Sequence, residues 1–145
     1  MLTTLEKVLL LQEVQSFQFV ETEDLAQLAG ITQEKSFEEG VELFREGDSS
    51  DSLFIIAEGC VELRRAGLVL LTGKRGDVFG TWALFDDEVR VATAKTLEPS
   101  TVLILGREVF LEALSDQSSI TEAVLKSMAQ RLRGIMGRLG PTAGG

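Results

Sequence analysis

The sequence lacks histidine and tyrosine altogether, and its 145 residues include one cysteine, one tryptophan and two prolines. Without histidine, a Ser-His-Asp triad or a histidine-rich zinc or iron site is impossible. A metal-dependent enzyme of the cupin type is therefore disfavoured. We expect no catalytic residue, no bound metal and no cofactor.

The single cysteine, Cys60, excludes an intramolecular disulfide and fits a reducing compartment. It falls in a segment with strand character, where we expect a buried small side chain rather than a reactive thiol. No apolar run approaches the length of a membrane span, and the start lacks the basic region and cleavage site of a signal peptide. We expect a cytoplasmic domain that makes no membrane contact of its own.

The charge is acidic, with a net value of −9 concentrated in the first two-thirds of the chain. Such a balance argues against a nucleic-acid surface, so we expect no nucleic-acid partner. The basic residues gather late, where they are typical of the solvated face of one helix: Lys126, Arg131, Arg133 and Arg138.

Residues 1–36 are predicted to form helices. Thr3 and Glu6 have the spacing of a capping box, and an apolar stripe follows them. Thr22 is predicted to cap a second helix that Gly30 ends.

From Phe37 the apolar period changes to two, and glycines separate the segments. Many short strands with frequent turns indicate an antiparallel β-barrel or jelly roll over residues 37–105. The pairs that mark the predicted strands are Val41 and Leu43, Leu53 and Ile55, Val61 and Leu63, Val69 and Leu71, Val89 and Val91, and Val102 and Ile104.

Residues 106–139 return to a helical pattern. Ser119 and Glu122 suggest a second capping box before a long helix. Residues 140–145 read as a flexible tail after Gly140-Pro141. We therefore expect one α+β domain over residues 1–139, a barrel flanked by helices. The stripe of the last helix is Ile120, Val124, Met128, Leu132, Ile135 and Leu139.

The segment from Gly76 to Ala94 is the best candidate for a ligand site. Two glycines bracket a short apolar turn, and Arg90 follows the second by ten residues. Free backbone N–H groups at such a turn form a concave anion site, and an arginine can bind a phosphate through two hydrogen bonds. If Val89 and Val91 share one face of a strand, Arg90 and Ala92 share the other.

These residues resemble the cyclic-nucleotide-binding domain family, which includes regulatory subunits of protein kinase A, catabolite activator proteins and gated channels. The resemblance runs from about Leu5 to Leu139. Its centre is a phosphate-binding cassette with the family pattern Phe-Gly-Glu, an apolar residue, Ala-Leu and, after a variable stretch, Arg-Ala-Ala-Thr. Here the two parts read Phe79-Gly80-Thr81-Trp82-Ala83-Leu84 and Arg90-Val91-Ala92-Thr93.

The resemblance implies that Arg90 and the N–H groups of Gly80, Ala83 and Val91 hold a cyclic phosphate. The family glutamate that binds the ribose 2′-hydroxyl is replaced by Thr81, which alters the cassette and would weaken binding. Val91 lacks the hydroxyl of cGMP-preferring relatives, which favours cAMP. The implied ligand-binding residues are Phe79, Gly80, Thr81, Trp82, Ala83, Leu84, Arg90, Val91 and Ala92.

Several alternatives stay open. Arg90 could pair with the nearby carboxylates of residues 86–88 instead of a phosphate. We expect Trp82 to pack the cassette against a helix. A base cap could come from the last helix, with Met128, Arg131 and Leu132 as candidates, although simple helix packing explains these three as well.

The expected function is a regulatory module, signalling through movement of the cassette and of the C-terminal helix. The alternative is a degenerate, nucleotide-independent copy that serves as an interaction or dimerisation scaffold. In that case the last helix would pair in a homodimer, or with another part of a larger bacterial protein to which the domain is fused.

Overall fold

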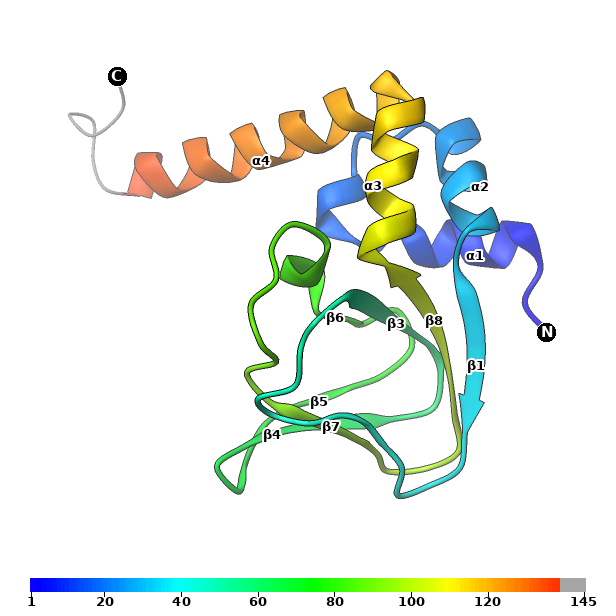
Figure 1. The fold of residues 1–145 in the computed structure, drawn as a ribbon, viewed down its shortest axis with the longest axis vertical. Coiled ribbons are helices and arrows are strands. Elements are labelled where there is room, and N and C mark those ends of the chain that lie inside the picture. Colours follow the sequence, from blue (N-terminus) through cyan, green and yellow to red (C-terminus); the bar gives the residue numbers. More distant parts are fainter. Residues whose placement is uncertain (139–145) are drawn as a thin grey trace.

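The computed structural model describes residues 1–138, in which two antiparallel four-stranded sheets form a jelly roll with helices at one end (Figure 1). The strand orders are β1-β8-β3-β6 and β2-β7-β4-β5. This confirms the α+β class and the antiparallel barrel flanked by helices. The strands are β1 Gln33–Phe37, β2 Glu42–Phe44, β3 Ser52–Glu58, β4 Val61–Arg65, β5 Leu68–Gly73, β6 Val78–Phe79, β7 Thr93–Thr96 and β8 Ser100–Gly106. The helices are α1 Thr4–Leu11, the 3-10 turn η1 Gln15–Phe17, α2 Thr22–Gly30, the 3-10 turn η2 Thr81–Leu84, α3 Arg107–Asp116 and α4 Ser118–Arg138.

The N-terminal helices follow the sequence signals in part. The predicted capping box is present, because Thr3 accepts a hydrogen bond from the Glu6 N–H and the Glu6 carboxylate accepts one from the Thr3 N–H. The predicted cap of the second helix is wrong by one residue. Glu21 is its N-cap, without a side-chain hydrogen bond, and Thr22 is already helical.

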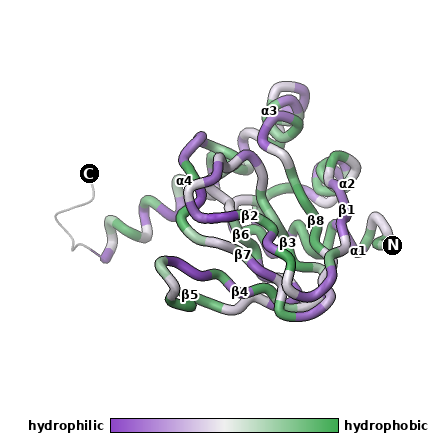
Figure 2. The backbone as a smooth tube through the Cα atoms, turned by 60° about the horizontal axis from the view of Figure 1, so that its bottom comes forward, coloured by the Kyte–Doolittle hydropathy of each residue, from purple (hydrophilic) through white to green (hydrophobic). Residues whose placement is uncertain are grey.

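Strand β3 lies between two hydrophobic cores, which is why it is apolar without interruption from Leu53 to Ala57 (Figure 2). Successive side chains of a strand point to opposite faces. Leu53 and Ile55 pack among the helices, whereas Phe54 and Ile56 pack inside the barrel. Strand β8 is shared in the same way, since its Leu103 and Leu105 pack among the helices and its Val102 packs inside the barrel.

Three sequence predictions in the barrel need correction. The barrel begins at Gln33 rather than Phe37, because the polar-looking β1 pairs with β8. Val89 and Val91 do not form a regular strand; Val89 makes an isolated bridge with Ser49, and the regular strand β7 starts at Thr93. Cys60 lies in the turn between β3 and β4 and is partly buried.

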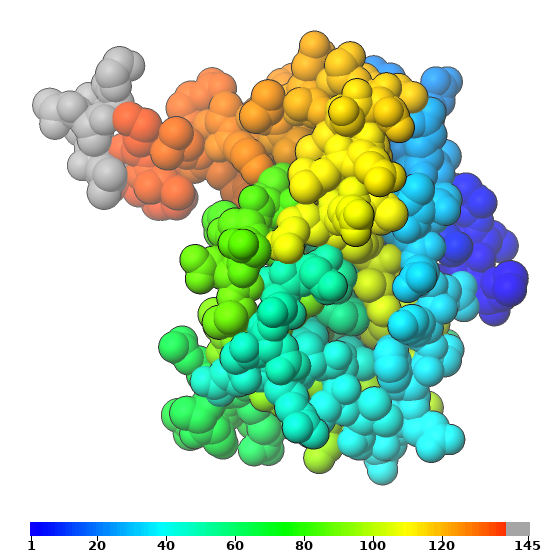
Figure 3. Space-filling view, viewed as in Figure 1, coloured from blue at the N-terminus to red at the C-terminus, as the bar shows by residue number. Residues whose placement is uncertain are grey.

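Helix α4 lies against the N-terminal helices as far as Arg131, and its end extends away from the body (Figure 3). Ser119 lies inside α4 and donates a hydrogen bond to the Asp24 carboxylate over 2.6 Å, so the predicted capping box at its start is wrong. The predicted stripe is split: Ile120 and Val124 are buried, whereas Leu132 and Ile135 are exposed. Its last member, Leu139, and the tail 140–145 lie outside the described residues. No helix among residues 1–138 has the length and apolarity needed to cross a membrane.

Candidate functional site

The site begins at Gly80, where β6 turns into η2. Gly80 has φ +81°, a left-handed conformation that residues with a Cβ rarely adopt. A Cβ here would lie 2.3 Å from Arg90 Nη1. The glycine therefore gives both the turn and the space for a guanidinium beside the backbone.

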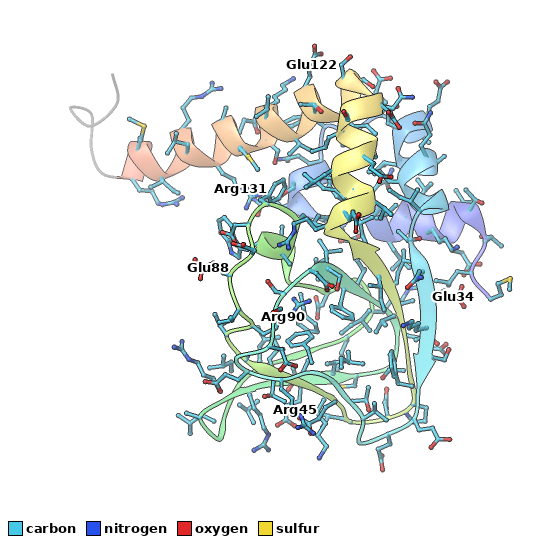
Figure 4. The ribbon with its side chains drawn as sticks, viewed as in Figure 1. Glu34, Arg45, Glu88, Arg90, Glu122 and Arg131 are labelled. Carbon is cyan, nitrogen blue, oxygen red and sulfur yellow. The ribbon has the colours of Figure 1, made fainter. Side chains whose placement is uncertain are left out.

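Arg90 lies inside the barrel and not on its surface, with 6% of its area exposed (Figure 4). Its backbone is fixed by the loop before β3, since Arg90 N donates to the Asp48 carbonyl and Gly47 N donates to the Arg90 carbonyl. Nη2 donates to the Ser52 carbonyl over 2.8 Å. The guanidinium carbon lies 4.3 Å from the Phe44 ring centre and 5.3 Å from that of Phe54.

The Arg90 guanidinium is incompletely satisfied. Its Nε is buried and is the buried side-chain nitrogen or oxygen without a hydrogen-bond partner among residues 1–138. Burial lowers the pKa of Arg90, and Asp51 and Asp48 act in the opposite direction. An arginine stays protonated in proteins, so the barrel holds a cation with spare hydrogen-bonding capacity. Such a group favours an anion in the space beside it.

That space is a pocket of about 540 Å³ between the two sheets and the cassette. Most of its wall is apolar, with Arg90 as its one cationic side chain. The lining residues are Phe44, Ser50, Leu63, Leu71, Val78, Phe79, Gly80, Trp82, Ala83, Asp86, Glu88, Val89, Arg90, Val91 and Ala92.

The predicted ligand-binding residues are largely brought together. The pocket is lined by Phe79, Gly80, Trp82, Ala83, Arg90, Val91 and Ala92. Thr81 does not line it, and Leu84 is buried in the helical core. The N–H of Ala83 donates to the Gly80 carbonyl in this structure, so it is engaged within the 3-10 turn.

Other side chains named from the sequence lie elsewhere in this structure. Among the described residues Arg90 makes no ion pair with the carboxylates of residues 86–88. Trp82 does not pack against a helix but is 73% exposed. None of the three base-cap candidates on α4 lines the pocket. Met128 packs on the helical core, and Arg131 donates to the Ser16 hydroxyl over 2.7 Å (Figure 4).

Arg107, the first residue of α3, connects the site to the C-terminal helices and was missed by the sequence reasoning. Its Nη1 donates to the carbonyls of Ala83 and Asp86 in the cassette, and to that of Ser50. Phe85 also packs edge-on against Phe110 of α3, with ring centres 5.8 Å apart. Phe44, Phe54 and Ser52 were missed as well, because no local pattern shows that β2 and β3 face Arg90.

A second hollow of about 700 Å³ lies along β1, β3, β8 and the start of α3. No buried unpartnered atom lies there among the described residues, in contrast to the Arg90 pocket. Residues 1–138 also contain no cluster of three or more potential metal ligands.

The comparison with protein families gives a match over residues 34–117 to the model described as cyclic nucleotide-binding domain. The chain belongs to the cyclic nucleotide-binding domain family. The matched range contains both sheets apart from Gln33, together with the cassette and α3.

Several relatives of this cyclic nucleotide-binding domain are regulatory proteins. A CRP-like cAMP-activated global transcriptional regulator of Mycobacterium tuberculosis is 32% identical over 123 residues, which are 81% of this chain and 54% of that protein. A cAMP-dependent protein kinase regulatory subunit of Emericella nidulans is 30% identical and matches 76% of this chain and 27% of its own length. The chain thus spans about half or less of these relatives. Their names support a regulatory rather than an enzymatic domain.

Among solved structures, the N-terminal domain of a transcriptional regulator from Streptomyces coelicolor superposes with a TM-score of 0.82 at 29% identity. It covers 87% of this chain and 94% of that one. That N-terminal domain therefore has the same architecture as the present cyclic nucleotide-binding domain.

Proposed function

We propose that this domain binds a 3′,5′-cyclic nucleotide, with cAMP preferred, and that Arg90 holds the cyclic phosphate. The observation that carries the proposal is the buried Arg90 guanidinium, which faces a pocket while its Nε has no partner. Leaving a buried charged donor unsatisfied costs about 1–3 kcal/mol or more. A phosphate oxygen would satisfy that donor and neutralise the charge.

The preference for cAMP follows from Val91, which lies at the pocket and has no hydroxyl to offer to guanine. The cAMP-activated relative supports the same choice. The cyclic phosphate of the ligand would therefore lie at Arg90, and its base would lie against the apolar lining of the pocket.

Signalling would pass from the cassette to α3 and α4. Arg107 and the contact between Phe85 and Phe110 already join the cassette to α3. Phosphate capture at Gly80 and Arg90 would draw the cassette inward, and these contacts would move the helices with it.

Isothermal titration calorimetry with cAMP tests the proposal. Because a hydrogen bond to a charged group contributes about 1.5–3 kcal/mol, Arg90→Ala should lower the affinity by about ten- to a hundredfold or more. Arg90→Lys, which keeps the charge without the planar fork, should retain only part of the binding. Arg133→Ala removes an exposed arginine on α4 and should bind cAMP as the unmodified protein does.

Equal binding heats for the unmodified protein and Arg90→Ala would overturn the proposal. Thermal unfolding of each variant checks that the fold is intact. Titration with cGMP under the same conditions tests the preference, which requires a weaker affinity for cGMP.

A second candidate function is a nucleotide-independent interaction scaffold. It is favoured by three exposed apolar side chains on α4, Leu125, Leu132 and Ile135. Leu125 and Leu132 are seven residues apart, the spacing of a coiled-coil seam. These three side chains could pack against a partner helix from a second copy or from elsewhere in a longer protein.

A further inference from the structure

Trp82 is the most exposed aromatic side chain at the pocket. It follows the Gly80 turn by two residues, and 73% of its surface is open to solvent. An indole side chain has a large apolar surface, and burying that surface against another group lowers the free energy. The same side chain lines the Arg90 pocket, together with the exposed side chains of Leu71, Val89 and Val91.

The other aromatic rings of the pocket are already engaged. The Phe44 ring is stacked under the Arg90 guanidinium. Phe79 is buried in the barrel core. Trp82 is therefore the pocket aromatic whose ring remains available to a ligand.

No side chain of α4 among the described residues lines the pocket. Met128 is committed to the helical core and Arg131 to Ser16. A ligand held at Arg90 would therefore meet no cover from α4 in this arrangement. Among the described residues that line the pocket, the exposed aromatic side chain is Trp82 of the cassette.

We propose that Trp82 stacks on the purine base of the bound cyclic nucleotide, so that the cassette contacts both ends of the ligand. Arg90 would hold the anionic end and the Trp82 indole the flat aromatic end. This inference rests on the proposed function, because the phosphate must first be placed at Arg90. Stacking depends on the aromatic face and tolerates either purine, so Trp82 supplies affinity rather than choice of base.

The chain itself provides the probe. Trp82 is its only tryptophan and tyrosine is absent, so tryptophan emission reports on this one position. Titration with cAMP should change the emission of Trp82 saturably, with the same midpoint as calorimetry. In Arg90→Ala the change should require about ten- to a hundredfold more cAMP.

Two substitutions separate stacking from bulk. Base–aromatic stacking contributes about 1–3 kcal/mol per base, so Trp82→Leu should weaken cAMP binding by about five- to a hundredfold. Trp82→Phe keeps a flat ring and should lose less. Leu68→Ala removes another exposed apolar side chain that does not line the pocket, and it should bind cAMP unchanged.

The outcomes distinguish the two proposals. If cAMP binds in an Arg90-dependent way, but Trp82 emission stays constant and Trp82→Leu binds equally well, the stacking role is wrong and the proposed function stands. If calorimetry detects no cAMP binding at all, the proposed function fails and the stacking role with it. If emission changes with protein concentration and not with cAMP, Trp82 lies at a protein interface and the stacking role is also wrong.

Discussion

At the scale of the residue, Arg90 combines a buried guanidinium with a hydrogen-bond donor, Nε, that has no partner among the described residues. Two phenylalanine rings and the Ser52 carbonyl contact it, but no carboxylate among the described residues pairs with it. Strained or under-satisfied groups of this kind concentrate at functional sites. We therefore expect an anion bound beside Arg90 to stabilise the domain.

Thr81 does not line the pocket, but it occupies the cassette position at which a larger side chain could reach a bound ligand. The family resemblance places at this position a glutamate that binds the ribose 2′-hydroxyl, and Thr81 is only partly buried here. We expect Thr81→Glu to raise the affinity for cAMP by about ten- to a hundredfold, because a charge-assisted hydrogen bond is added. Calorimetry measures the gain.

The matched control is the ligand 2′-deoxy-cAMP, which lacks the hydroxyl. Its affinity should not rise in Thr81→Glu. An equal gain for both nucleotides would show that the new carboxylate acts elsewhere than on the ribose.

At the scale of the element, helix α4 is held to the N-terminal helices by polar contacts. Ser127 donates to the Gln15 carbonyl over 3.0 Å, and Arg131 donates to Ser16. Ser119 donates to Asp24, a carboxylate with little exposure, over 2.6 Å. These contacts fix the angle at which α4 leaves the domain, and any movement of α4 must break or shift them.

Ser119→Ala should destabilise the domain by about 1–3 kcal/mol, because the buried Asp24 carboxylate loses its donor. Chemical denaturation measures the change in the free energy of unfolding. Ser115→Ala, an exposed serine on α3, is the control and should change stability little. If the two variants are equally stable, the link between Ser119 and Asp24 does not hold α4 in solution.

At the scale of the whole molecule, the exposed apolar side chains of α4, Leu125, Leu132 and Ile135, predict self-association. The end of α4 extends beyond the body (Figure 3). Leu132 of this helix is 59% exposed. We expect sedimentation velocity to show a coefficient that rises with protein concentration, because pairing would bury these side chains.

The double variant Leu132→Lys and Ile135→Lys should remain monomeric over the same range. Leu97→Lys, which alters an exposed apolar residue outside α4, should associate as the unmodified protein does. A constant coefficient for the unmodified protein at all concentrations would contradict dimerisation through α4.

Much of the architecture was predictable because its signals are local. The capping box at Thr3 and Glu6 depends on atoms three residues apart. The period of two that brings Val61 and Leu63 of β4, and Val102 and Ile104 of β8, to the barrel core lies within a single strand each time. The Gly80 turn is equally local, since only glycine accepts φ +81° beside another side chain. The position of Arg90 opposite Val89 and Val91 also followed from alternation, although no regular strand forms there.

The remaining features depend on segments that are distant in the sequence, and only the tertiary structure decided them. Gln33–Phe37 is a strand because β8 pairs with it, although its residues are mostly polar. Ser119 faces Asp24 across 95 positions of sequence, so it bonds a carboxylate instead of capping its own helix. Trp82 stays at the surface because the buried positions around the cassette are filled by Leu84, Phe110 and their neighbours. A sequence specifies which side chains avoid water, whereas the packing of remote segments determines which of them find room inside.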